Sequence, residues 1–271
     1  MIGRRIKVGI VGCGAIGSEL AHYILKELKH SYYLTALCDR DVKKAEHLLS
    51  SLSSSVQILS IEKLIKSCDM VIESASISAA HDLITRMAKV RKRLVILSVG
   101  VFVKYPRLLS SINKGGLTLY VPSGAIAGVD GISSLALEEI KSITLLTSKP
   151  PSSLRDIPFL KRKRIDVSRI RRPTKVFEGN IKKAIKYFPK NINVAAIIFL
   201  ASRFRKIKVV IKVDPFLKRN THRIEVNAVG GRLYVEIENF PSSLNPRTSR
   251  MAILSTKNLL KKITSSIKVG S

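Results

Sequence analysis

The sequence predicts an α/β protein in which a doubly wound parallel sheet is followed by a second α/β domain. Two observations lead to this prediction. Over residues 1–121, short apolar segments rich in β-branched residues alternate with amphipathic stretches of helical period. Such alternation is typical of parallel strands whose connecting helices cover both faces of the sheet. After Pro122 the pattern changes to longer strands, which indicates a domain boundary near this residue.

The expected elements follow from these periodicities. In the first domain we expect strands at 6–11, 33–38, 70–73, 94–99 and 117–121, and helices at 15–28, 42–52, 78–89 and 104–112. In the second we expect strands at 143–147, 206–213, 223–228 and 232–238, and helices at 181–187, 193–202 and 247–263. Gly230 and Gly231 indicate a hairpin turn between the last two strands.

The domains predicted from this pattern are 1–121, which would bind a dinucleotide, and 122–245, which would hold the substrate and the catalytic group. Residues 246–271 form a C-terminal segment whose helix is expected to pack back onto the first domain. Hydrophobic residues make up 45% of the chain, which excludes disorder as its main state. The longest uncharged apolar run, 194–201, has eight residues. A membrane-spanning helix needs roughly 20, so no membrane partner is expected.

Three cysteines, Cys13, Cys38 and Cys68, leave an odd count and show no Cys-x-x-Cys spacing. This argues against a disulfide framework and against a zinc module, and it favours a cytoplasmic location. We therefore expect no metal site.

The charge is extreme, since 48 Lys and Arg against 19 Asp and Glu give a formal net charge of +29. The densest basic stretch is 161–164, followed by Arg169, Arg171, Arg172 and Lys175. It is either a polyanion-binding strip or a solvated basic loop. No aromatic residue is interleaved for stacking on bases, and no zinc-finger or RNP-type pattern accompanies it. We therefore favour the solvated loop and do not expect a nucleic acid partner.

A glycine-rich motif of the form G-x-G-x-x-G joins the first strand to the first helix. Gly12 would allow the tight turn, Gly14 would let the backbone approach a pyrophosphate, and Gly17 would let helix and strand pack closely. The amides of Ala15 and Ile16 lie at the positive end of the helix, where a phosphate binds well. The first domain is therefore predicted to be a Rossmann-type dinucleotide-binding domain.

A second signal concerns the cofactor. Asp39 ends the next strand, 22 residues after Gly17, where a carboxylate would bind the ribose 2′-hydroxyl of NAD. Arg40 could instead stack on adenine or hold the 2′-phosphate of NADP. NAD is favoured, and NADP stays open. Ser98 and Gly100 end another strand at the same edge of the sheet, where they either bind the cofactor or form an ordinary turn.

Several segments in order along the chain carry a family resemblance. They include Glu-Ser-Ala-Ser at 73–76, Leu-Ser-Val-Gly-Val-Phe at 97–102, Pro-Ser-Gly-Ala-Ile-Ala-Gly-Val-Asp at 122–130, Val-Phe-Glu-Gly at 176–179, Phe-Pro-Lys-Asn-Ile-Asn-Val-Ala-Ala at 188–196, Asp-Pro at 214–215, Asn-Thr-His at 220–222 and Asn-Pro-Arg-Thr-Ser at 245–249. With the glycine motif, they resemble the L-aspartate dehydrogenase family over nearly the whole chain. Ser78 and Ala79, where a Pro-Glu type pair is commoner, and the basic insertion at 160–172 depart from the family pattern.

The resemblance implies a homodimer that oxidises L-aspartate to iminoaspartate with NAD or NADP. The reverse reaction is the reductive amination of oxaloacetate with ammonia, and the pathway is pyridine nucleotide synthesis. It also implies that His222 is the catalytic histidine, because an imidazole can exchange a proton near pH 7. Ala125 and Asn193 would contact the cofactor, as would Ala75, although Asn193 could equally cap a helix.

The two carboxylates of aspartate require cations or oriented N–H groups in the pocket. Lys190, Arg247, Thr248 and Ser249 are candidates for this role, although the segment that holds the last three could simply start the last helix. Two alternative functions remain open. One is a related two-domain reductase, similar to dihydrodipicolinate reductase or homoserine dehydrogenase. The other is a non-enzymatic basic Rossmann protein that binds polyanions.

Overall fold

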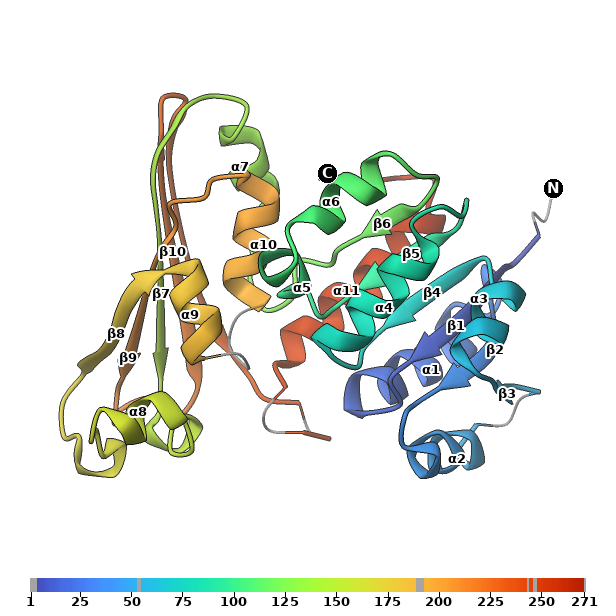
Figure 1. Cartoon of the computed structure of the whole chain (residues 1–271), viewed down its shortest axis with the longest axis horizontal. Coiled ribbons are helices and arrows are strands. Elements are labelled where there is room, and N and C mark those ends of the chain that lie inside the picture. The colour runs from blue at the N-terminus through green and yellow to red at the C-terminus, as the bar shows by residue number, and fades with distance from the viewer. Residues whose placement is uncertain (1–3, 53–54, 189–192, 243, 246–247, 271) are drawn as a thin grey trace. The chain divides into compact units, whose positions relative to one another are not determined.

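The computed structural model describes residues 4–52, 55–188, 193–242, 244–245 and 248–270. Its contacts divide the chain into two compact units (Figure 1). Unit 1 comprises Met1–Pro122 and Ile253–Lys268, and unit 2 comprises Ser123–Ala252 and Val269–Ser271.

Unit 1 is built on a six-stranded sheet in the order β3-β2-β1-β4-β5-β6, with all neighbouring strands parallel. This is the strand order of doubly wound dinucleotide-binding folds, so the predicted fold class is confirmed. The strands are β1 (Ile6–Val11), β2 (Tyr32–Cys38), β3 (Gln57–Ile58), β4 (Met70–Glu73), β5 (Arg93–Ile96) and β6 (Thr118–Tyr120). The helices are α1 (Ala15–Glu27), α2 (Val42–Ser50), α3 (Ile61–Ser67), α4 (Ile77–Met87), α5 (Val101–Lys104), α6 (Arg107–Asn113) and, from the end of the chain, α11 (Arg250–Thr264).

The core of unit 1 forms where apolar helix faces meet the sheet. Helix α1 buries Gly17, Leu20, Ala21 and Ile24, which recur at the spacing of one helical face. All four residues of β4 are buried, as expected for a central parallel strand that is covered on both faces.

The C-terminal helix α11 belongs to unit 1 from Ile253 onward. Leu260 is fully buried in the core of this unit. The carbonyl oxygen of Leu260 accepts a hydrogen bond from the Tyr32 hydroxyl at 2.7 Å. Lys257 on the same helix pairs with Glu19 of α1 at 2.7 Å. Apolar packing, a buried hydrogen bond and a partly buried ion pair therefore attach the end of the chain to its first domain.

Unit 2 is built on a mixed five-stranded sheet in the order β11-β10-β7-β9-β8. Only the β7–β9 pair is parallel. The strands are β7 (Ile140–Lys149), β8 (Thr174–Asn180), β9 (Lys208–Val213), β10 (Asn220–Ala228) and β11 (Gly231–Asn239). The helices are α7 (Val129–Leu135), α8 (Pro158–Arg162), α9 (Ile181–Tyr187) and α10 (Asn193–Ser202), with short 3₁₀ turns η1 (Pro151–Ser153) and η2 (Val167–Arg169).

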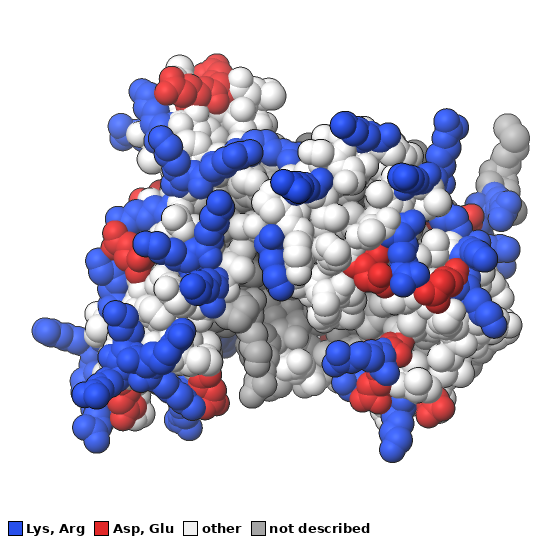
Figure 2. All heavy atoms as spheres, in the orientation of Figure 1, with Lys and Arg blue, Asp and Glu red and all other residues white. Residues whose placement is uncertain are grey.

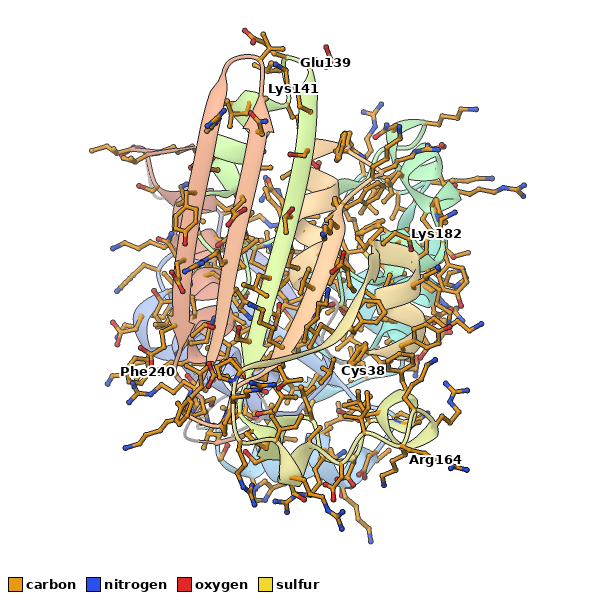
Figure 3. All side chains as sticks on the ribbon, turned by 90° about the vertical axis from the view of Figure 1, so that its left-hand side faces the viewer. Cys38, Glu139, Lys141, Arg164, Lys182 and Phe240 are labelled. Atoms are coloured by element: carbon orange, nitrogen blue, oxygen red, sulfur yellow. The ribbon has the colours of Figure 1, made fainter. Side chains whose placement is uncertain are left out.

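The two faces of this sheet differ in composition. Helices α7, α9 and α10 lie on one face, which we call the inner face (Figure 1). Along β10 the inner positions are His222, Ile224, Val226 and Ala228, all buried. Figure 3 looks onto the outer face, with Glu139 and Lys141 at one end of the long strands and Phe240 at the other. The outer face carries polar and charged side chains, including the Arg223–Glu236 ion pair at 2.9 Å.

The predicted helix over 104–112 is wrong as a single helix. The chain forms two short helices, α5 and α6, which are separated at Tyr105. Tyr105 precedes Pro106, and the proline ring disfavours helical backbone at the residue before it. The hairpin turn also shifts by one residue: Ala228 pairs with Gly231, so Val229 and Gly230 form the turn. Elements β3, α3, α7, α8 and β8 were not predicted.

Lys and Arg cover much of the molecular face shown in Figure 2, with Asp and Glu at fewer places. The basic stretch 161–164 lies at the end of α8 and just beyond it, and all four residues are exposed. Lys161 pairs with Asp156 at 3.4 Å, and Arg169 pairs with Asp166 at 3.3 Å. Such exposed pairs contribute little to stability, and the arrangement has the character of a solvated loop.

Candidate active site

The glycine motif forms the turn between β1 and α1, and its geometry admits only glycine at two positions. Gly12 has φ +101°, and a Cβ placed there would lie 2.7 Å from the backbone nitrogen of Ala75. A Cβ on Gly17 would collide with the carbonyl oxygen of Gly12. The Gly12 N–H donates to the carbonyl oxygen of Cys38 at 2.8 Å, which ties the turn to β2. The backbone of the turn is therefore held in one conformation.

Gly14 differs from these two glycines, because a Cβ placed on it would meet nothing within 4 Å. It occupies the N-cap position of α1 and, as a glycine, has no side chain with which to cap this helix. The first-turn amides of Ala15, Ile16 and Gly17 lie at the positive helix end, where intrahelical partners are lacking. An uncapped helix N-terminus in front of open space fits a pyrophosphate group.

Asp39 lies just beyond β2 and binds the backbone of the glycine turn. Its Oδ2 accepts from the Cys13 N–H at 2.7 Å, and its Oδ1 accepts from the Asp41 N–H at 2.9 Å. Each carboxylate oxygen can accept a further bond, so a ribose hydroxyl can still be bound. Arg40 is the next residue, and it is exposed.

A buried carboxylate, Glu73, organises two further loops at this edge of the sheet. Its Oε1 accepts from the backbone N–H groups of Ala75 at 2.8 Å and Ser76 at 2.9 Å, and from the Ser98 hydroxyl at 2.8 Å. Its Oε2 accepts from the Ser98 N–H at 2.9 Å. Burial raises the pKa of Glu73, whereas these four donors favour the ionised form. Sequence reasoning missed Glu73, although an acidic residue that ends a buried strand is a signal that could have revealed it.

The loops that follow β1, β2, β4 and β5 all leave the sheet at the carboxyl ends of parallel strands. Gly12 to Gly17, Asp39, Ala75, Ser98 and Gly100 are therefore gathered at one edge, where ligands of open α/β sheets bind. Gly100 stands at the start of α5. The roles of these residues stay predictions.

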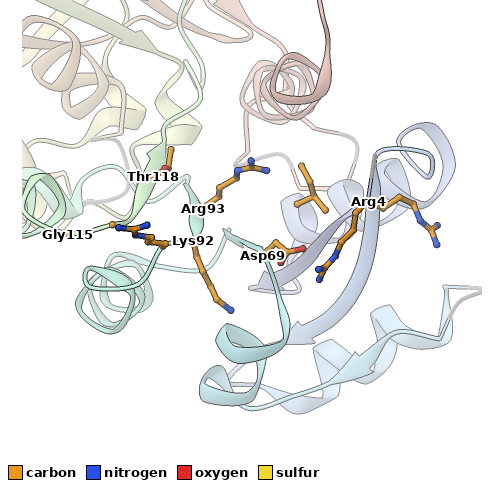
Figure 4. Close-up of a pocket in the computed structure, with 10 residues that line it drawn as sticks. Arg4, Asp69, Lys92, Arg93, Gly115 and Thr118 are labelled. Atoms are coloured by element: carbon orange, nitrogen blue, oxygen red, sulfur yellow. The ribbon is translucent and has the colours of Figure 1, made fainter. Parts of the chain in front are cut away.

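The amino ends of the same strands form a different pocket, of about 770 Å³ (Figure 4). Its lining includes Arg4, Arg93 and Asp69, which lie just before or at the start of β1, β5 and β4. This pocket is at the opposite edge from the glycine turn and contains none of the predicted cofactor residues.

In unit 2, His222 lies on β10 directly opposite Thr147 of β7. The imidazole is buried, and its Nδ1 is 3.0 Å from the Thr147 hydroxyl oxygen. Burial, with a smaller contribution from Lys149, lowers the pKa of His222 to about 3. The imidazole is therefore neutral at pH 7, with one ring nitrogen unprotonated. Thr147 and Lys149, two residues apart on β7, were not identified from the sequence.

Ala125 and Asn193 also lie in unit 2. The Ala125 carbonyl oxygen accepts from the Asn239 side-chain amide at 3.1 Å. The preceding residue, Gly124, has φ +64°, and a Cβ there would lie 2.8 Å from the Ile197 side chain of α10. Asn193 is the first residue of α10. The turn at Ala125 is thus fixed by β11 and packs close to α10.

A pocket of about 200 Å³ in unit 2 is lined by Asn220, Asn239, Thr248 and Ser249, among others. The Ser249 hydroxyl donates to Asn239 Oδ1 at 2.6 Å. The structure thus brings Thr248 and Ser249, two of the four residues expected to hold carboxylates, to one pocket. Lys190 and Arg247 lie outside the described residues.

The described parts of the chain lack two other features, a metal-binding cluster and a membrane-spanning helix. No cluster of three or more His, Cys, Asp and Glu side chains there could hold a metal ion. None of the helices there combines the length and the apolar character needed to cross a bilayer. All three cysteines are free thiols.

Comparison with known proteins places this geometry in a family. The chain is 39% identical to an L-aspartate dehydrogenase of Methanosarcina mazei over 272 aligned residues, which cover 98% of this chain and all of the relative. The chain belongs to the L-aspartate dehydrogenase family. An L-aspartate dehydrogenase of Methanocaldococcus jannaschii is 38% identical over 273 residues, with 98% of this chain and all of the relative covered.

Models of protein families and solved structures agree with this assignment. Residues 130–263 match the C-terminal domain of aspartate dehydrogenase, and residues 12–122 match the NAD-binding domain of homoserine dehydrogenase. The crystal structure of an aspartate dehydrogenase from Thermotoga maritima superposes with a TM-score of 0.78 at 29% identity, covering 98% of this chain and 100% of that one. Membership of this family favours oxidation of L-aspartate over the two alternatives that the sequence left open, a related two-domain reductase and a polyanion-binding protein.

Proposed function

We propose that the chain oxidises L-aspartate to iminoaspartate with NAD or NADP, and in reverse aminates oxaloacetate reductively. The observation that carries this proposal is the end-to-end similarity to L-aspartate dehydrogenases, at up to 39% identity in the relatives named above. Two features support it: a glycine turn in unit 1 whose geometry fits a phosphate group, and a neutral, buried imidazole in unit 2. In this scheme residues 1–121 bind the cofactor, 122–245 supply the proton-transfer group, and 246–271 return to the first domain.

The cofactor proposal is a dinucleotide whose pyrophosphate binds at Gly12, Gly14 and the amides of Ala15, Ile16 and Gly17. The open space in front of Gly14 fits this group. When bound, the nicotinamide ring accepts a hydride from the substrate. Asp39 favours NAD through its acceptor oxygens, while the exposed Arg40 could hold the extra phosphate of NADP. Ala75, Ser98 and Gly100 would line the path toward the nicotinamide, and Ala125 and Asn193 would contact it.

The proton step is assigned to His222. Removing a hydride from Cα of L-aspartate and a proton from its amine leaves the imine, so the amine proton needs an acceptor. If Nδ1–H donates to the Thr147 hydroxyl oxygen, the lone pair on Nε2 is available to accept that proton. In the reverse direction the imidazolium returns the proton to the imine nitrogen, which becomes the amine as Cα receives the hydride.

The proposal also includes a cellular location, an oligomeric state and a metabolic role. The molecule would work in the cytoplasm, which the three free thiols favour. It would form a homodimer, for which the outer face of the mixed sheet is available, because the helices α7, α9 and α10 cover only the other face (Figure 1). Its product would supply pyridine nucleotide synthesis.

The test of the reaction is an absorbance assay for reduced cofactor with each of the common L-amino acids, with NAD and with NADP. L-aspartate is expected to give the highest kcat/KM. A higher kcat/KM for another amino acid, or no reduced cofactor with any of them, would refute the proposal. Light scattering after size-exclusion chromatography tests the dimer, for which a mass of about twice 30.0 kDa is expected.

A further inference from the structure

The inner face of the mixed sheet changes character toward one end. Ile143 and Leu145 on β7, and Ile224 and Val226 on β10, are buried and apolar. Beyond them the same face carries a polar group of residues. Because side chains alternate between faces along a strand, Thr147 and Lys149 share this face with Leu145, and Asn220 and His222 share it with Ile224.

The register places these residues side by side. Thr221 pairs with Ser148 and His222 pairs with Thr147 across the antiparallel β7–β10 ladder. Lys149 and Asn220 follow one position further along each strand. The charge on Lys149 contributes to the lowered pKa of His222, as expected for groups this close. We call Thr147, Lys149, Asn220 and His222 the polar end of the inner face.

Lys149 is unusual because its side chain is almost entirely buried, with 7% exposed. Burial lowers the pKa of Lys149 to about 8, so at neutral pH the side chain is still mainly an ammonium ion. Taking an ammonium ion out of water is costly. A shifted titratable group beside a candidate catalytic residue often marks a functional site.

A second observation at the polar end concerns Asn220. Its side-chain Oδ1 is buried and has no hydrogen-bond partner among the residues that the structure describes. Buried acceptors in native proteins are nearly always bonded, so an unsatisfied one indicates a missing donor. The polar end thus presents a cation, an open acceptor and a proton acceptor. This set is complementary to a molecule with a carboxylate and an amino group.

We propose that Lys149 is the cation that binds a carboxylate of the substrate beside His222, an inference that rests on the proposed amino-acid dehydrogenase function. The carboxylate accepts from the Lys149 ammonium, and the amino group donates to Asn220 Oδ1. Binding then places the amine nitrogen on the polar end, where His222 accepts its proton. The negative charge that arrives with the substrate also offsets the effect of Lys149 on the imidazole, so His222 becomes a stronger base when substrate is bound.

The test compares Lys149→Met, which removes the charge and keeps an unbranched chain, with Lys149→Arg and with Lys212→Met. Lys212 lies on the neighbouring strand β9 opposite Ser148, so it faces the other side of the sheet. Lys149→Met is expected to raise KM for L-aspartate about 10- to 100-fold, the effect of one charge-assisted hydrogen bond. KM for the cofactor should not rise, and the melting temperature should not fall. Lys149→Arg should recover part of the loss, and Lys212→Met should behave as wild type.

An unchanged KM for L-aspartate in Lys149→Met, or an equal rise in KM for aspartate and cofactor, would overturn the inference. A binding measurement separates this outcome from failure of the proposed reaction. Calorimetric titration with succinate, in the presence of saturating NADH, measures carboxylate binding at Lys149. This measurement does not depend on whether aspartate is oxidised. Succinate should bind wild type and Lys212→Met alike and bind Lys149→Met at least tenfold more weakly. Equal binding to all three proteins, or none to wild type, refutes the role of Lys149.

Discussion

Asp39 Oδ2 accepts a hydrogen bond from the backbone N–H of Cys13 at 2.7 Å. The residue proposed to determine the preference for NAD over NADP therefore also stabilises the glycine turn. Removing the side chain therefore has two effects. Asp39→Ala should weaken binding of both cofactors, because the turn loses an acceptor. It should also lower the ratio of kcat/KM for NAD to kcat/KM for NADP.

The two effects can be separated with Asp39→Asn, which keeps an acceptor oxygen and removes the charge. We expect this variant to lower the NAD-to-NADP ratio by about tenfold, the change that one lost hydrogen bond of about 1.4 kcal/mol produces. Adding Arg40→Ala should then reduce activity with NADP. Kinetics with both cofactors measure the ratio. A parallel loss for NAD and NADP in Asp39→Asn would mean that Asp39 only supports the turn.

Gly14→Ala tests the proposed phosphate site, and its melting temperature shows whether the fold is affected. A Cβ at position 14 meets nothing within 4 Å, so the melting temperature should be unchanged. The added methyl group would occupy the space proposed for the pyrophosphate, and NADH affinity should fall at least tenfold. Gly17→Ala is the contrasting variant, since its Cβ collides with the Gly12 carbonyl oxygen and should lower the melting temperature itself. Fluorescence titration with NADH and thermal unfolding measure both effects. Normal NADH affinity in Gly14→Ala would show that the pyrophosphate does not bind at Gly14.

Glu73 provides a prediction about both stability and cofactor binding. Glu73→Ala would leave three backbone N–H groups and one hydroxyl without their acceptor. Unsatisfied buried donors cost about 1–3 kcal/mol each, although relaxation and water reduce the sum, so a loss of several kcal/mol is expected. Glu73→Gln should lie between wild type and Glu73→Ala, because it retains one acceptor oxygen. Urea unfolding gives the free energies, and a loss below about 1 kcal/mol in Glu73→Ala would show that the loops are held by other contacts.

The fold and the nucleotide edge could be predicted because their signals are local in sequence. Helices α9 and α10 begin and end where periodicity places them, at Ile181–Tyr187 and Asn193–Ser202. Strand β8 (Thr174–Asn180) was missed because charged and polar residues interrupt its apolar pattern, as is common in an edge strand. Helix α7 was missed because Gly131 and two serines weaken its helical propensity.

A residue of the candidate site could be predicted only where its own type and its immediate sequence neighbours indicate its role. His222 is recognisable as a titratable residue within an Asn-Thr-His segment that resembles the family. Thr147 and Lys149 lie about 75 residues earlier along the chain and meet His222 only through the pairing of β7 with β10. No local pattern marks an inward-facing lysine at a strand end, so its burial became visible only from the sheet register.

His222→Ala should retain cofactor binding and lower kcat by about 10² to 10⁴, the range that general acid–base catalysis contributes. Thr147→Val removes the partner of Nδ1 and keeps the shape of the side chain. It should lower kcat by roughly 3- to 10-fold without changing KM for the cofactor, because the imidazole would lose its orientation. Steady-state kinetics and NADH titration provide the measurements. Full turnover in His222→Ala would remove the imidazole from the proton step.

His222 also gives a pH dependence of stability. Its pKa in the folded chain, about 3, lies below the ordinary value of 6.5. Between these values the unfolded chain binds a proton that the folded chain does not, so stability falls as pH decreases from 6.5 toward 3. His222→Gln has no titrating imidazole at this position, so its melting temperature should fall less than that of wild type between pH 7 and pH 5. Identical slopes would mean that the imidazole is more accessible than its burial indicates.

Lys149 should cost stability in proportion to its burial. Its folded-state pKa of about 8 lies below the ordinary value of 10.5, so folding is penalised while both states carry the proton, below pH 8. Lys149→Met removes the penalty, and at pH 7 this variant should be more stable than wild type by up to about 3 kcal/mol. As pH rises from 8 to 10.5 the unfolded chain binds more protons than the folded one. Wild type therefore gains stability over this range, and the advantage of the variant should shrink. Wild type and Lys149→Met can be compared by urea unfolding at pH 7 and at pH 10. A variant less stable than wild type at pH 7 would show that folded-state partners stabilise the ammonium ion. A more stable variant that binds the substrate poorly would instead mean that the chain keeps a destabilising charge because its function requires one.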